Sequence, residues 1–329
     1  MLKCKLLLLA LSTILLGCSP KPSDTNQTYT ERLGKVFDTD GLQIEKLSVL
    51  PHSATDKPLS SYTISVIDLA KLGHCRVSTH IANHNNQLGK LAKPSEQFKY
   101  SLNFIQLAQA CINNDKTPDD VRQALTMARQ EKLAQLYPML AYVFTHEKEL
   151  TQFFTLTFSE IQLETSQGEI RALESLNTLS SLIDSLQEPS LAKGDTLTTA
   201  LEKLNNNNYV QSLITSTRTQ IKWNQTTTAW LSTLNLDNKV CPAGKNKKRA
   251  KVLNNVFQKF YIQDIQAYQS QLAKRLHDIE PHFAAFSNKF GQHDYPNVIT
   301  PLLGELKQSA KEHVFWWQNF YKVCKVNPL

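Results

Sequence analysis

Residues 253–279 read LNNVFQKFYIQDIQAYQSQLAKRLHDI, and their apolar side chains recur every three or four positions. That spacing places them on one face of a helix for about seven turns. We therefore predict a long amphipathic helix with one buried face. Because an internal proline removes a backbone hydrogen bond, we expect the helix to end before Pro281. The predicted buried face consists of Leu253, Phe257, Tyr261, Ile265, Tyr268, Leu272, Leu276 and Ile279.

Helical spacing returns from Leu303 to Cys324 and, less regularly, over most of the chain. Glycine accounts for only 10 of 329 residues, and a chain poor in turn-forming residues favours long helices. Residues 41–61 should be extended, whereas residues 153–165 fit either a strand or the end of a helix. We predict an all-α fold over residues 29–329, a multi-helix, bundle-like single domain. The other expected helices are 29–38, 64–72, 75–86, 95–112, 117–144, 169–186, 195–204 and 210–234.

The first 17 residues have the composition of an export signal. Lys3 and Lys5 precede an apolar run that is too short to span a bilayer. The run closes on Leu-Leu-Gly-Cys at 15–18, which resembles the lipobox of bacterial lipoproteins, in which the cysteine is acylated and becomes the N-terminus. We predict a signal peptide over 1–17, lipid attachment at Cys18 and a flexible tether over 18–28. The alternative is an ordinary secreted protein with a cysteine near its cleavage site.

Four cysteines remain once Cys4 is removed with the signal and Cys18 carries lipid. An even number in an exported chain predicts two disulfides. Three pairings are possible, and we favour the two that are local in sequence. A metal site shared with histidines is the alternative, because His80 and His84 stand four residues apart on an expected helix. The favoured disulfides are Cys75–Cys111 and Cys241–Cys324, which would staple the helical domain together.

Two blocks of sequence, each containing two of these cysteines, resemble a family of uncharacterised Gram-negative envelope lipoproteins. The resemblance implies disulfides within each block and a location in the cell envelope, facing the periplasm. Ser19 after the lipidated cysteine is compatible with the outer membrane. No catalytic residue is implied, because the family has no known function. The matching segments are Leu72–Cys75 (LGHC), Asn85–Lys90 (NNQLGK), Pro94-Ser95, Cys111-Ile112, Cys241–Gly244 (CPAG), Asn255–Tyr261 and the tryptophan-rich end before Cys324.

Two short segments are candidate contact surfaces. Without Lys3 and Lys5 the chain has 34 cationic and 29 acidic side chains, a net charge of +5. This excess suits an anionic surface such as lipid headgroups or cell-wall polymer, and is too small to indicate nucleic acid. Near the C-terminus, aromatic side chains lie off the expected buried face. The candidate contact residues are Lys245, Lys247, Lys248, Arg249 and Lys251 in the basic run, and Phe315 and Trp316 in the aromatic segment.

Motifs that would indicate catalysis are missing from the sequence. It contains neither a Gly-x-Ser-x-Gly nucleophile motif nor a glycine-rich phosphate loop. We therefore expect no catalytic residue, cofactor or metal, and interpret the chain as a binding or scaffold protein. Its expected partners are the membrane, through the lipid, and an envelope protein, cell wall or anionic lipid. A lipid- or small-ligand carrier, which requires an apolar cavity, and a periplasmic hydrolase are the alternatives.

Overall fold

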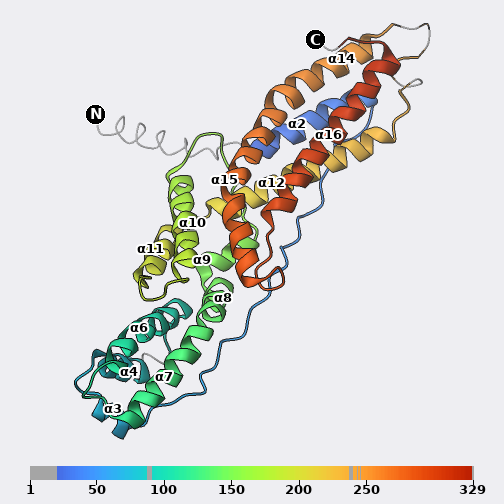
Figure 1. The fold of residues 1–329 in the computed structure, drawn as a ribbon. Helices are drawn as coiled ribbons and strands as arrows, with labels where there is room; N and C mark the ends of the chain where they lie inside the picture. Colours follow the sequence, from blue (N-terminus) through green and yellow to red (C-terminus); the bar gives the residue numbers. More distant parts are fainter. Residues whose placement is uncertain (1–20, 87–90, 237–239, 243, 245, 328–329) are drawn as a thin grey trace, which may run out of the picture. The chain divides into compact units, whose positions relative to one another are not determined.

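The structure is a computed structural model that describes residues 21–86, 91–236, 240–242, 244 and 246–327. Every regular element in these residues is a helix, which confirms the all-α fold (Figure 1). No helix among them combines the length and apolar character that a membrane crossing needs. The α-helices are α2 (Pro22–Phe37), α3 (Val66–Lys71), α4 (Arg76–Asn85), α6 (Pro94–Ile112), α7 (Asp119–Ala134), α8 (Leu136–His146), α9 (Lys148–Thr151), α10 (Gln167–Ser185), α11 (Asp195–Leu204), α12 (Tyr209–Ser232), α14 (Lys248–Val256), α15 (Gln266–Phe290) and α16 (Ile299–Cys324).

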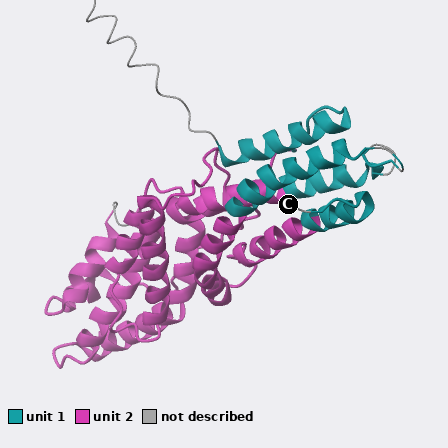
Figure 2. Cartoon of the chain, turned by 90° about the horizontal axis from the view of Figure 1, so that it is seen from above, with its two compact units in different colours: residues 1–44, 223–268, 313–329 teal, residues 45–222, 269–312 magenta. Residues whose placement is uncertain are grey.

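The helical body expected over residues 29–329 divides into two compact units, coloured separately in Figure 2. One boundary between them lies in irregular chain after residue 44, and the other three fall within α12, α15 and α16, so each of these helices contributes residues to both units. Unit 1 comprises residues 1–44, 223–268 and 313–329, and unit 2 comprises residues 45–222 and 269–312.

Unit 1 is built around aromatic side chains. Tyr29 and Leu33 of α2 are buried in one cluster with Phe257, Tyr261 and Trp317. The Phe257 and Trp317 rings stack with centroids 4.3 Å apart. These residues come from three segments distant in sequence, so their packing holds the N-terminal, central and C-terminal parts of the unit together.

The first described helix corrects our expectation of a flexible tether over residues 18–28. Helix α2 begins at Pro22, where a proline has no hydrogen bond to lose in the first turn. The Asp24 carboxylate accepts a hydrogen bond from the backbone N–H of Lys21 at 2.8 Å, which caps the helix start. Asn26 is buried, so part of the predicted tether belongs to the folded body.

The long helix predicted from residue 253 differs at both ends and in the middle. It begins at Lys248 and passes through a π-helix, η2 (Phe257–Ile265), before continuing as α15. It does not stop before Pro281, which lies inside α15. Phe283 and Phe286 are fully buried beyond the proline. Burying two phenylalanines stabilises by roughly 3–6 kcal/mol, which offsets the ~3 kcal/mol cost of an internal proline.

Unit 2 contains a second aromatic core and a buried ion pair. Phe144 packs against Phe286 and Tyr295 with centroids 4.9 and 5.2 Å apart. Arg275 on α15 donates to Glu169 at 3.1 Å, and its guanidinium also donates to the backbone carbonyl of Gln162 at 2.9 Å. This anchoring answers the question left open for residues 153–165. A short 3₁₀ helix, η1 (Gln152–Phe154), is followed by irregular chain that Arg275 holds in place.

Residues 45–64, which we call the strap, run along unit 2 without regular structure until they reach α3. This part of the chain is extended and attached through individual hydrogen bonds, as expected for residues 41–61. Arg218 donates to the carbonyl of Ser48 at 2.6 Å, and the hydroxyls of Thr55 and Thr145 lie 2.8 Å apart. The strap thereby reaches α7, where its last residues border a cavity.

Candidate ligand pocket

A cavity of about 240 Å³ lies in unit 2 between the strap and helices α4, α6 and α7. Its wall combines apolar side chains with the polar groups of Ser60, Tyr62, Thr63, His84, Asn85, Tyr100 and Lys132. Such a mixture is typical of small-molecule sites, in which apolar walls supply affinity and a few polar groups fix orientation. The apolar lining includes Ile64, Ile81, Phe104, Leu125 and Ala128.

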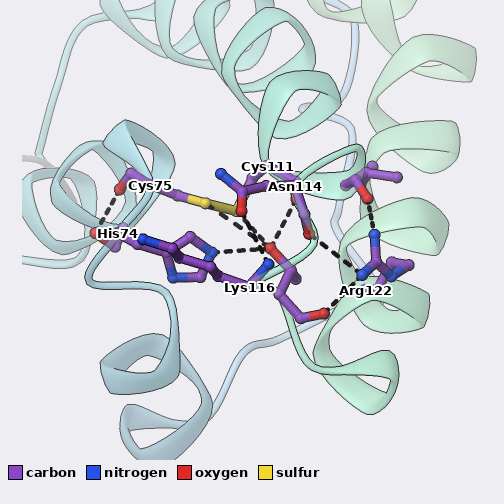
Figure 3. Close-up of a disulfide and its surroundings, with 9 residues drawn as sticks. His74, Cys75, Cys111, Asn114, Lys116 and Arg122 are labelled. Atoms are coloured by element: carbon purple, nitrogen blue, oxygen red, sulfur yellow. Dashed lines mark hydrogen bonds between the residues drawn. A yellow bond between two sulfur atoms is a disulfide. The ribbon is translucent and has the colours of Figure 1, made fainter.

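The Cys75–Cys111 disulfide joins the helices that form this cavity (Figure 3). It ties the start of α4 to the end of α6, with Cα atoms 5.7 Å apart. Next to it, the Thr117 hydroxyl donates to the carbonyl of Cys111 at 2.7 Å. Arg122 donates to the carbonyls of Ile112 and Thr117, which fixes the turn between α6 and α7. The walls of the cavity are therefore cross-linked both covalently and by hydrogen bonds.

Both predicted disulfides, Cys75–Cys111 and Cys241–Cys324, are confirmed. The sulfur atoms of Cys75 and Cys111 lie within 4.8 Å of a ring nitrogen of His74, the geometry of a metal site. Both sulfurs are already bonded to each other, so neither is a thiolate that could bind metal. Cysteine use in this region is structural.

The two histidines considered as metal ligands flank an aromatic ring instead. His84 stacks on Tyr100 with centroids 3.6 Å apart, and His80 stacks on the same ring at 4.6 Å. Burial lowers the pKa of His84 to about 4, and the positive charge of Lys132 adds to the effect. Burial also raises the pKa of Tyr100 to about 12. At neutral pH the wall therefore presents a neutral imidazole and a protonated phenol.

Lys132 is the charged group on the cavity wall. Its ammonium lies 5.1 Å from the ring centroid of Tyr100 and 5.6 Å from that of Phe104. Burial lowers the pKa of Lys132, against the opposing effect of the neighbouring Glu131 carboxylate, and the charge of Lys57 lowers it further. In the described part of the chain Lys132 forms no salt bridge.

The nearest acid in sequence, Glu131, is engaged by the strap. Its carboxylate accepts hydrogen bonds from the backbone N–H of Ser61 at 2.7 Å and the hydroxyl of Ser60 at 3.0 Å. Burial would raise the pKa of Glu131, yet these hydrogen bonds bring the pKa below its usual value. Glu131 thus remains ionised and holds the strap, while the ammonium of Lys132 keeps a cationic position on the cavity wall.

Comparison with known proteins places the chain in a family. A family model described as "Protein of unknown function (DUF3080)" matches residues 26–328. The chain belongs to this family. Neither the curated proteins nor the solved structures include a match. The family has no known activity, as the sequence resemblance implied, and membership in it assigns no residue a role.

The basic run of this DUF3080 chain lies partly in α14, and Lys245 falls outside the described residues, as does Cys18. Lys247 donates to the carbonyl of Lys325 at 2.8 Å, and Arg249 forms an ion pair with Asp38 at 2.8 Å. The run therefore lies beside the C-terminal end of α16. The side chains of Lys248 and Lys251 are exposed at the start of α14.

Only one of the two aromatic residues that we expected to be exposed near the C-terminus is exposed. Phe315 is 68% exposed, but Trp316 is only 9% exposed and packs edge-on against Trp317 with centroids 5.0 Å apart. Trp316 also stacks on Phe320 at 6.1 Å. Its placement on a contact surface is therefore wrong, because α16 is covered on more than one face. Phe315 remains available as a contact.

Sequence reasoning missed Lys132 and Tyr100 as pocket residues. A signal was present, because Leu125, Ala128 and Lys132 recur at helical spacing on one face of α7. A lysine on an otherwise apolar face of a DUF3080 helix indicates a half-buried charge, and such a charge needs a partner. The ring beside it, Tyr100, belongs to α6, so the sequence of α7 alone could not predict this contact.

Proposed function

We propose that this DUF3080 protein is a lipid-anchored binding protein of the bacterial cell envelope, which holds a small apolar ligand in the cavity of unit 2. The cavity is the observation that supports this function, since a ligand carrier requires an apolar cavity between helices. The His84 imidazole, the Tyr100 phenol and the Lys132 ammonium on its wall supply polar groups that can orient a bound ligand. The proposal assigns the protein no chemistry of its own.

The envelope location rests on two observations. The LLGC sequence at 15–18 resembles a lipobox, and the four cysteines beyond it are paired in disulfides. Disulfides of this kind persist in oxidising compartments such as the periplasm. Only three residues separate Cys18 from Pro22, the first residue of α2. Four Cα-to-Cα steps span at most about 14 Å, so an acylated Cys18 would hold α2 close to the membrane surface.

The basic surface of unit 1 supports a contact with anionic headgroups at that membrane. Exposed Lys248 and Lys251 lie at the start of α14, and exposed Phe315 lies on α16 in the same unit. Basic side chains near an anionic membrane contribute about 1 kcal/mol each. The anchor and the basic surface would act together on unit 1, and the ligand would bind to unit 2.

A cavity-filling variant tests the binding function. We expect the purified mature chain to bind toluene saturably, as followed by chemical-shift changes in NMR spectra. Ala128→Phe should abolish this binding, because Ala128 lines the cavity. Ala134→Phe, at an exposed position near the end of the same helix, is the matched control and should bind as the wild type does. Absence of saturable binding to the wild type would refute the assignment.

The lipid anchor is tested independently of the ligand. Mass spectrometry of the N-terminal peptide from the membrane fraction should show a diacylglycerol-modified Cys18. Cys18→Ser should leave an uncut precursor or release the protein from that fraction. An unmodified N-terminal peptide, together with an unchanged membrane fraction for Cys18→Ser, would contradict the lipoprotein assignment.

A further inference from the structure

The cavity of unit 2 has a cation, Lys132, on its wall, and the carboxylate next to it in sequence is hydrogen-bonded to the strap. Glu131 is the residue before Lys132, yet its oxygens accept from Ser60, Ser61 and Tyr62 of the strap. Lys132 instead lies over the Tyr100 and Phe104 rings, which attract a cation but do not neutralise its charge. An anion entering the cavity would therefore meet an ammonium without a salt-bridge partner among the described residues.

A second cation acts on the groups of the cavity wall, in addition to the Glu131 carboxylate. Lys57 of the strap acts on both Lys132 and His84, and its charge lowers the pKa of each. Lys132 and Lys57 both contribute positive charge in a half-buried environment, where charge–charge interactions are stronger than in water, and the Glu131 carboxylate offsets part of it.

The size and shape of the cavity limit the rest of the ligand. Its volume of about 240 Å³ is below that of sites for drug-sized molecules, roughly 300–1,000 Å³. It exceeds the ~150 Å³ of an engineered cavity that binds benzene. One aromatic ring or a short branched chain, with a polar group attached, therefore fits.

We propose that the cavity binds a small apolar carboxylate, with the carboxylate paired to Lys132 and the apolar group against Ile81, Phe104 and Leu125. This inference rests on the proposed binding function and specifies its ligand class. The same chemistry occurs in a free aryl or branched-chain acid and in the C-terminal residue of a peptide. In both cases the ligand supplies a carboxylate partner for Lys132, which forms no salt bridge within the described residues.

Matched ligands and variants test this assignment by titration calorimetry on the full mature chain. We expect phenylacetate to bind about tenfold more tightly than phenylacetamide, its neutral counterpart, because a charge-assisted hydrogen bond is stronger than a neutral one. Lys132→Met should remove this preference and leave the affinity for phenylacetamide within about twofold. Lys132→Arg should retain the preference. Lys116→Met, at an exposed lysine in the turn before α7, is the control.

The two sources of the carboxylate are separated by peptide ligands. Glycylglycylphenylalanine with a free carboxylate and its C-terminal amide are titrated beside phenylacetate. Binding of the free-carboxylate peptide identifies a peptide terminus as a ligand, and exclusion of the peptide with retention of phenylacetate identifies a free acid. Equal affinity for phenylacetate and phenylacetamide, or a preference that survives in Lys132→Met, would overturn the assignment. If toluene still bound, the proposed function of binding a small apolar ligand would stand, and only the assignment of a carboxylate would fail.

Discussion

The two units differ in charge and in how they accommodate buried polar groups. From Cys18 onward, unit 1 has 12 cationic and 6 acidic side chains, a net charge of +6, whereas unit 2 has 22 and 23, a net charge of −1. The whole cationic excess of residues 18–329 therefore belongs to unit 1, and the cavity with Lys132 belongs to unit 2. Under the proposed function, attraction to an anionic surface and binding of a small ligand would therefore belong to different parts of the chain.

The two units also contain different kinds of buried titratable groups. In unit 1, His313 is fully buried, and its two ring nitrogens lie 2.9 Å from the hydroxyls of Tyr29 and Thr228. Burial lowers its pKa to about 3, so it is neutral. In unit 2, Arg275 and Glu169 are buried as an ion pair. His313 in unit 1 is thus kept uncharged, whereas Arg275 and Glu169 in unit 2 are buried as a pair of opposite charges.

Removing each disulfide has the largest expected effect on stability and tests whether the units are separate. The Cys241–Cys324 bond joins two residues of unit 1 across a sequence separation of 83, although its loop includes residues 269–312 of unit 2. The Cys75–Cys111 bond has a separation of 36 and lies wholly within unit 2. Chain entropy gives losses of about 4.6 and about 3.8 kcal/mol for the paired serine variants. Amide hydrogen exchange should show each loss mainly in the unit that contained the bond. Equal loss of protection in both units from either variant would mean that they unfold together.

The sequence was sufficient to predict most helices from periodic apolar positions and two disulfides from an even cysteine count, and the pairing that is local in sequence proved to be the one formed. It was insufficient where tertiary packing decides. Pro281 ends a helix by local rules, but Phe283 and Phe286 are buried beyond it and keep the helix continuous. Trp316 lies off the main apolar stripe, yet neighbouring helices bury it as well. Lys132 becomes a pocket residue only through the rings of Tyr100 and Phe104, which α6 supplies.

Acid is expected to have the next largest effect, and His313 should account for it in unit 1. Because the folded pKa of about 3 lies below the unfolded value of about 6.5, the unfolded chain binds one more proton between these pH values. The free energy of unfolding therefore falls by about 1.4 kcal/mol for each pH unit of acidification in this window. At pH 5 it is about 2 kcal/mol lower than at neutral pH. Above about pH 6.5 the His313 imidazole is neutral in both the folded and the unfolded chain, so it no longer lowers the free energy of unfolding.

Histidine variants show which unit carries this acid sensitivity. His313→Gln should flatten the pH dependence of hydrogen exchange for unit 1 amides only. His84→Gln is the counterpart in unit 2, where a half-buried imidazole with a pKa of about 4 should give a smaller change of the same sign. Exposed His293 provides a third variant, His293→Gln, as the control. An unchanged slope for unit 1 in His313→Gln would contradict the neutral buried imidazole.

Reversing exposed charges has the smallest expected effect on stability and tests the contrast in charge directly. Lys248→Glu with Lys251→Glu lowers the net charge of unit 1 from +6 to +2. Acidic residues are favourable in the first turn of a helix, so the free energy of unfolding should rise or stay within about 0.5 kcal/mol. Binding to vesicles that contain phosphatidylglycerol should nevertheless weaken, since each basic residue near the surface contributes about 1 kcal/mol.

The matched control makes the same change of charge in unit 2. Lys307 and Lys311 are exposed on the part of α16 that belongs to unit 2, so Lys307→Glu with Lys311→Glu removes the same four units of charge. If the cationic surface of unit 1 makes the contact, this control should bind the vesicles about as well as the wild type does. Equal weakening by both double variants would show that total charge alone governs binding. The division of functions between the units would then have to be abandoned for the membrane contact, while the ligand titrations on Lys132 would be unaffected.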